Sequence, residues 1–82
     1  MEGKKNLAEN PYERLANGIV LQAVEDYRSA LRKLKRKADN RDAMDEALRI
    51  EKFFRSQWYG QLTGIDGEYL IRRLREEIRQ SE

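Results

Sequence analysis

The fold of this chain is decided by residues 20–40, which read VLQAVEDYRSALRKLKRKADN. Apolar residues recur there at alternating spacings of four and three, namely Val20, Val24, Tyr27, Leu31, Leu34 and Ala38. This spacing places them along one side of a long helix that packs lengthwise against another helix. Asp39 and Asn40 then end the pattern, and both residue types favour the start of a new helix.

Capping residues extend this interpretation to the rest of the chain. After a flexible leader at residues 1–9, we expect helices over about residues 11–38, 42–59 and 67–80. The signals that begin them are Asn10 with Pro11, Asp39 or Asn40, and Asp66, because Asn and Asp accept hydrogen bonds from free helix N–H groups. A short turn between two long amphipathic helices predicts an antiparallel hairpin. The sequence therefore predicts an all-α fold, a long antiparallel helical hairpin with a shorter third helix, in one domain at residues 10–82.

The chain is also expected to self-associate. Eighty-two residues give only a small core, and chains of this size rarely gain a large surplus of stability from it. The first helix is also longer than a short third helix can cover. We expect a homo-oligomer whose interface is made by Val20, Val24, Tyr27, Leu31 and Leu34.

Composition argues against several classes of function. The chain has no Cys and no His, which removes disulfides, thiolate metal sites and the commonest general base. Acidic residues form no cluster typical of a metal site. No apolar run is long enough to span a bilayer, and the first residues lack the apolar core of a signal peptide. We expect a cytoplasmic protein with no catalytic residues, metal, cofactor or membrane partner.

Residues 53–70 combine aromatic residues with glycines: they contain five of the seven aromatic residues and three of the five glycines. We expect a corner core where the third helix folds back, made by Phe54, Trp58, Leu62, Ile65 and Leu70. Packing does not require the residue types of Arg55, Tyr59, Tyr69, Arg72 and Arg73. Aromatic faces, glycine N–H groups and guanidinium groups together can hold a nucleotide-like anion. These five are the predicted ligand-binding residues.

A second charged feature is the basic run at residues 28–41, with seven cations and one acid. On a helix, Arg28, Arg32, Lys35 and Arg36 form a cationic stripe that could contact nucleic-acid phosphates. No known nucleic-acid-binding signature accompanies it. The same charges also suit the solvated C-terminal end of a helix, so both interpretations stay open.

Three segments resemble a group of small uncharacterised proteins of phages, prophages and mobile elements of Gram-positive bacteria. They are NPYE at residues 10–13, AVEDYRSAL at residues 23–31, and residues 53–71, with FFRS, WY and LTGIDGEYLI. In size and helical hairpin character the chain is also similar to helical phage counter-defence proteins, oligomers that sequester cyclic nucleotides or related immune signals. That resemblance implies a binding protein acting inside a bacterial host.

Three functional hypotheses follow. The first is a non-enzymatic phage-type protein that captures an anionic nucleotide-like signalling ligand and so counters host immunity. The second is an inhibitor or adaptor that docks helix-on-helix onto a host protein. The third is a nucleic-acid-associated regulator that uses the basic stripe at residues 28–41.

Overall fold

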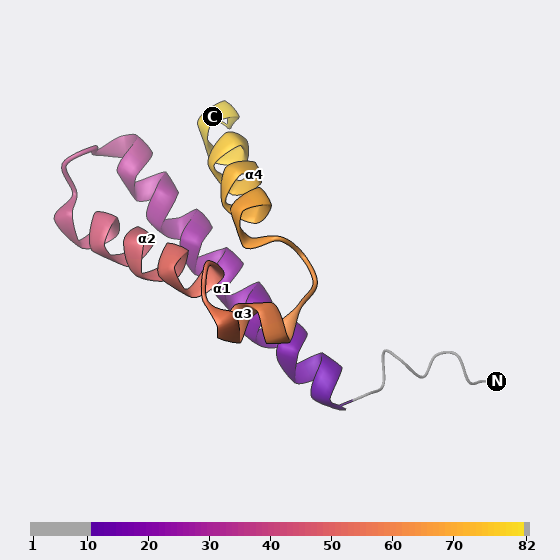
Figure 1. Cartoon of the computed structure of the whole chain (residues 1–82). Coiled ribbons are helices and arrows are strands. Elements are labelled where there is room, and N and C mark those ends of the chain that lie inside the picture. The colour runs from indigo at the N-terminus through magenta and orange to yellow at the C-terminus, as the bar shows by residue number, and fades with distance from the viewer. Residues whose placement is uncertain (1–10, 82) are drawn as a thin grey trace.

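The computed structural model describes residues 11–81, with their side chains from Arg14 onward. This part is 84% helical and has no strand. Its helices are α1 (Pro11–Arg36), α2 (Arg41–Phe54), α3 (Gln57–Leu62) and α4 (Gly67–Gln80) (Figure 1). The prediction of an all-α fold is confirmed. None of the helices in the described part is long and apolar enough to cross a membrane.

The antiparallel hairpin of α1 and α2 is confirmed (Figure 1). Between them, Asn40 caps α2, because its side-chain oxygen accepts a hydrogen bond from the Ala43 N–H at 3.0 Å. Basic residues fill the last turn of α1, and Asp42 lies in the first turn of α2. Both arrangements match the helix dipoles. The predicted cap at Asn10 lies outside the described residues.

The prediction of one continuous helix over residues 42–59 is wrong. Helix α2 ends at Phe54, and α3 begins after Ser56. The Ser56 hydroxyl donates to the Phe53 carbonyl at 2.7 Å and accepts from the Tyr59 N–H at 3.1 Å. Such local side-chain bonds compete with the regular helical pattern and start a new helix. Farther on, Asp66 caps α4 by accepting from the Tyr69 N–H at 3.2 Å, as predicted.

The core lies where the four helices meet. Its buried residues come from every helix: Val24, Tyr27, Ala30, Ala47, Ile50, Phe54, Tyr59, Ile71 and Leu74. The Phe54 ring meets the rings of Tyr27 and Tyr59 edge-on, each at a centroid distance of 5.6 Å. Edge-to-face packing is a favourable arrangement for aromatic pairs. Phe54 therefore joins α1 to α3 through α2.

The predicted corner core is only partly formed. Phe54 is buried and Leu62 and Leu70 are half-buried, but Trp58 is 53% and Ile65 51% exposed. The cause is the new helix start at Ser56, which turns Tyr59 inward in place of Trp58. The prediction is therefore wrong for Trp58 and Ile65.

The predicted oligomer interface also needs correction. Tyr27 is fully buried and Val24 is 8% exposed within the single chain, so neither can contact a second copy. Val20, Leu31 and Leu34 pack against the same core. The reason is that α4 is long enough to lie along the C-terminal half of α1 (Figure 1) and to cover this side of it together with α2. The prediction is therefore wrong for Val24 and Tyr27, whereas for the half-buried Val20, Leu31 and Leu34 it stays a prediction.

We predict that Gly67→Ala destabilises the chain, because the added Cβ would overlap the backbone carbonyl of Phe54. Neither backbone can move without disturbing the core, so the free energy of unfolding should fall by about 1–3 kcal/mol. Gly64→Ala is the matched control, since a Cβ there meets nothing within 4 Å. Urea unfolding followed by circular dichroism measures both variants. Equal stabilities would contradict this close approach.

Candidate functional site

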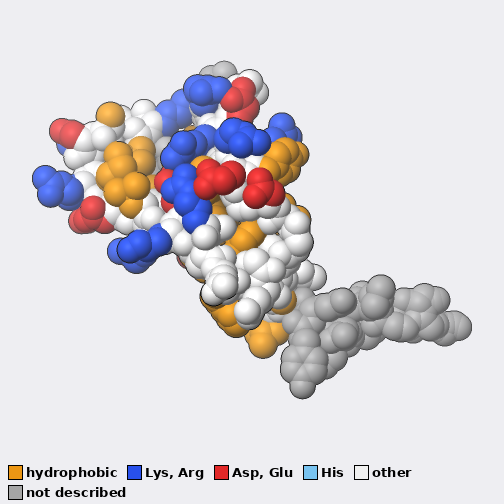
Figure 2. Space-filling model, viewed as in Figure 1, with side chains coloured by type: hydrophobic (Ala, Val, Ile, Leu, Met, Phe, Trp, Pro, Cys, Tyr) orange, Lys and Arg blue, Asp and Glu red, His pale blue; other side chains and the backbone are white. Residues whose placement is uncertain are grey.

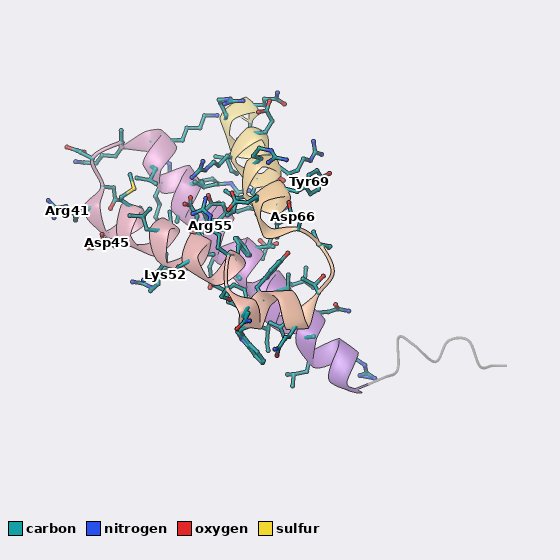
Figure 3. The ribbon with its side chains drawn as sticks, viewed as in Figure 1. Arg41, Asp45, Lys52, Arg55, Asp66 and Tyr69 are labelled. Atoms are coloured by element: carbon teal, nitrogen blue, oxygen red, sulfur yellow. The ribbon has the colours of Figure 1, made fainter. Side chains whose placement is uncertain are left out.

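The structure separates the five residues predicted to bind a ligand. Tyr59 is 2% exposed and belongs to the core. Tyr69, Arg72 and Arg73 lie exposed on α4. Arg55 is the C-cap residue of α2 and lies on the other side of α4 from Tyr69 (Figure 3). A cavity of about 440 Å³ between α3 and the start of α4 is lined by two of the five, Arg55 and Tyr59. The five residues therefore do not form one pocket.

The charge of Arg55 is already compensated by two carboxylates. Its guanidinium donates to Glu68, with one contact at 3.3 Å, and lies 3.5 Å from a Glu51 oxygen. The hydrogen bond from Arg55 is the main cause that lowers the pKa of Glu68 below its ordinary value. Asp66 also borders the cavity. This cavity therefore carries acidic groups beside its one arginine, which disfavours an anionic ligand.

A polar cluster of the buried Tyr27 and Glu51 with the half-exposed Arg75 connects α1, α2 and α4, and it was not predicted. The Tyr27 hydroxyl donates to Glu51 Oε2 at 2.5 Å, and Arg75 Nη2 donates to the same oxygen at 2.7 Å. Arg75 Nε also donates to the Tyr27 hydroxyl at 3.2 Å, which closes the triangle. Glu51 is only 5% exposed. Each group has a partner, so the cluster is suited to hold helices together rather than to react.

The pKa values in this cluster follow from its contacts. Burial, followed by the hydrogen bond to Glu51, raises the pKa of Tyr27 to about 12. Burial alone would raise the pKa of Glu51, but the hydrogen bonds from Tyr27 and Arg75 outweigh it and lower that pKa. Glu51 therefore stays ionised in the folded chain.

The spacing of α2 contains a signal for this cluster. Ala47, Ile50, Glu51 and Phe54 share the inward row of an amphipathic helix, and a single acid in such a row needs a buried partner. The signal is easily missed, because Glu51 is also one of several alternating charges in its segment of the sequence.

Two tyrosines allow a matched test of these contacts. Tyr27→Phe removes a buried hydroxyl bonded to both Glu51 and Arg75, so we expect a loss of about 1–3 kcal/mol in unfolding free energy. The Tyr59 hydroxyl is buried without a hydrogen-bond partner among the described residues. Tyr59→Phe should therefore keep or raise the stability, by about 1 kcal/mol. Urea unfolding measures both, and equal losses would contradict the assignment.

Acid titration tests the Glu51 carboxylate separately. Its folded pKa lies below its ordinary value of 4.5, so the unfolded chain takes up the proton first as the pH falls. The stability that its charge contributes is complete above about pH 4.5 and is lost as the pH falls through the folded value. We expect Glu51→Gln to weaken this acid dependence. Unfolding free energies of both proteins between pH 7 and 3 measure it, and parallel curves would contradict it.

Two of the four residues of the predicted cationic stripe are engaged within the chain. Arg28 pairs with Glu77 at 2.8 Å and with Glu25 at 2.9 Å. Lys35 Nζ donates to the carbonyls of Ile78, at 2.8 Å, and Arg79, at 3.2 Å. Lys35 thus binds the last carbonyls of α4, where a helix favours a cation. Arg32 and Arg36 are exposed. These contacts support the interpretation of the stripe as a structural charge pattern.

An apolar groove of about 590 Å³ lies between the first half of α1 and the end of α2. Two rows of α1 line it, Arg14, Gly18, Gln22 and Asp26 in one and Leu15, Ile19 and Ala23 in the other. Arg49, Ile50 and Phe53 complete it from α2. Leu15 is 63% exposed. We refer to these ten residues as the α1–α2 groove, which was not among the predicted sites.

The groove lies on the other side of α1 from α4, because Asp26, which lines the groove, and Arg28, which pairs with Glu77 of α4, are about 200° apart around the helix. The polar side-chain contacts between α4 and α1 involve Tyr27, Arg28 and Lys35, all in the second half of α1. The apolar residues of the first half therefore keep an open side. Figure 2 views the molecule from the side that carries α3 and α4, and it shows a separate group of apolar side chains at the lower edge, where α3 and the start of α1 lie in Figure 1. The spacing of Leu15, Ile19 and Ala23 is visible in the sequence, but spacing alone assigns these residues to the core side.

No group of acidic residues in the described part of the chain could hold a metal ion. No family model matches the chain, and neither a curated protein nor a solved structure is similar to it. The resemblance to phage and mobile-element proteins therefore stays a prediction, and the groove is the feature from which a function can be argued.

Proposed function

We propose that the chain is a non-catalytic protein-binding module that takes up an amphipathic helix in the α1–α2 groove. The observation that carries this proposal is the groove itself, whose walls are mainly apolar and whose edge includes the exposed side chain of Leu15. Contiguous exposed apolar surface on a small protein indicates an interaction site. A concave apolar surface between two helices suits an amphipathic helix, with apolar anchors at positions i, i+3 or i+4, and i+7.

The dimensions support a helix as the occupant. From Arg14 to Asp26 the groove follows α1 for about 18 Å, or about three helical turns. A docked helix of this length presents two or three large apolar side chains to Leu15, Ile19 and Phe53. Each such side chain that becomes fully buried contributes about 1.5–3 kcal/mol of favourable transfer free energy. The cost of association reduces this sum, so a groove of this length suits a reversible complex.

The charges weigh against the two other hypotheses. Capture of an anionic nucleotide-like ligand requires cations beside a pocket, but Arg55 is paired with Glu68 and Glu51. The stripe that was predicted to bind nucleic acid uses two of its four cations within the chain, since Arg28 pairs with Glu77 and Lys35 contacts the end of α4. Counter-defence by ligand capture therefore stays a prediction. Helix docking onto a host protein needs neither set of cations.

A displayed library of amphipathic helices tests this proposal without a named partner. We expect selected helices to carry apolar residues at positions i, i+3 or i+4, and i+7, because that pattern follows the groove. Leu15→Asp should weaken their binding by about tenfold or more, which corresponds to about 1.4 kcal/mol. Binding is measured by fluorescence anisotropy of a labelled selected helix.

The matched control is Leu48→Asp. Leu48 is a leucine of α2 that is 54% exposed, similar to Leu15, but it does not line the groove. Its replacement should leave the affinity unchanged. Equal losses in the two variants, or failure to select any helix, would contradict docking in the groove.

A further inference from the structure

We propose that the occupant of the α1–α2 groove is α1 of a second copy of the chain, in an antiparallel dimer with twofold symmetry. This inference rests on the proposed function and names the helix that the groove receives. In such a dimer α1 and α2 of both copies form a four-helix arrangement. Each copy donates the first half of its α1 and receives the same segment in return, so the interface is isologous.

The charges along the groove are complementary when two copies of α1 run antiparallel. Arg14 lies at one end of the α1 row in the groove and Asp26 at the other, with Gly18 and Gln22 between them. When a second α1 runs antiparallel, each Arg14 lies level with the partner's Asp26, about three turns from the matching pair at the other end. Arg14 makes this contact in addition to its interaction within its own chain. A parallel pairing would instead place like charges together.

Gly18 supplies an independent observation at the middle of the same row. A Cβ at this position meets none of the described residues within 4 Å, so no contact among them requires glycine. Glycine inside a helix costs about 0.5–1 kcal/mol relative to alanine. A second helix that packs closely against this turn makes glycine useful, because the absent side chain lets the two backbones approach.

The apolar side chains of the groove serve both copies. Leu15 is largely exposed and Ile19 half-buried, so each is available to enter the partner's groove. There they meet Ile50 and Phe53 on α2 together with Ala23 on α1. This surface is separate from Val24 and Tyr27, which the core of the single chain already uses. The dimer thus covers the apolar side of α1 that lies open in the groove of the single chain.

Charge exchange gives the most direct test. In sedimentation velocity experiments with the full chain, we expect a dimer for the unaltered protein. Arg14→Asp places two acids together at each end and Asp26→Arg places two cations together, so each variant alone should dimerise at least about tenfold more weakly. An equimolar mixture of the two variants recreates both opposite-charge pairs and should recover the dimer. Circular dichroism confirms that each variant is helical.

A glycine pair provides the second measurement. Gly18→Ala should weaken dimerisation by about tenfold, although alanine favours the helix of the single chain. Gly60→Ala is the matched control, because its Cβ also meets nothing within 4 Å but it lies in α3, outside the groove. Equal dimerisation of the two glycine variants would overturn the inference.

The outcomes separate this inference from the proposed function. A monomeric wild-type chain, or a variant mixture that stays monomeric, overturns the dimer. If a selected library helix still binds the groove and loses affinity with Leu15→Asp, the proposed function stands and the groove accepts another protein. If neither a second copy nor a library helix depends on Leu15, both proposals fail.

Discussion

The structure depends on the hydrogen-bonded triangle of Tyr27, Glu51 and Arg75, because each residue comes from a different long helix. Apolar packing alone lets two helices slide along each other with little change in buried area. A buried carboxylate that needs both a hydroxyl and a guanidinium allows one alignment, since any shift leaves a charge without its partner. The edge-to-face contact of Phe54 with Tyr27 begins one turn farther along α2 and reinforces the same alignment. The position of α4 on α1 follows from this alignment.

The helices were predictable where local signals agree. Apolar spacing in α1, the Asn40 and Asp66 caps and the basic end of α1 all act within a few residues, so the hairpin and the start of α4 could be found from the sequence. The break after Phe54 depends on Ser56, a residue type that is favoured at N-caps but also occurs inside helices, so the sequence allows either position. Tertiary packing of Tyr59 decides between them, and periodicity does not contain that information.

The candidate site was harder to predict for a related reason. A spacing pattern shows that a residue lies on the apolar side of a helix, but it does not show whether another helix covers it. Ile19 and Val24 belong to one apolar series, yet Ile19 lines an open groove and Val24 is buried. Residue types alone also made Arg55 a candidate ligand group, whereas the acids that neutralise it come from α2 and α4. Only the fold shows which charges are paired.

Because α4 covers only the second half of α1, a single continuous helix has two sources of stability. Its second half is held by the core of its own chain, whereas the first half forms a helix with fewer tertiary contacts. The free energy of binding in the groove is then reduced by the cost of ordering that half of the helix. Helix propensity at outward positions such as Asn17 becomes a determinant of affinity, although such a residue touches no partner. Evolution could therefore adjust the strength of the complex without altering the surface that recognises it.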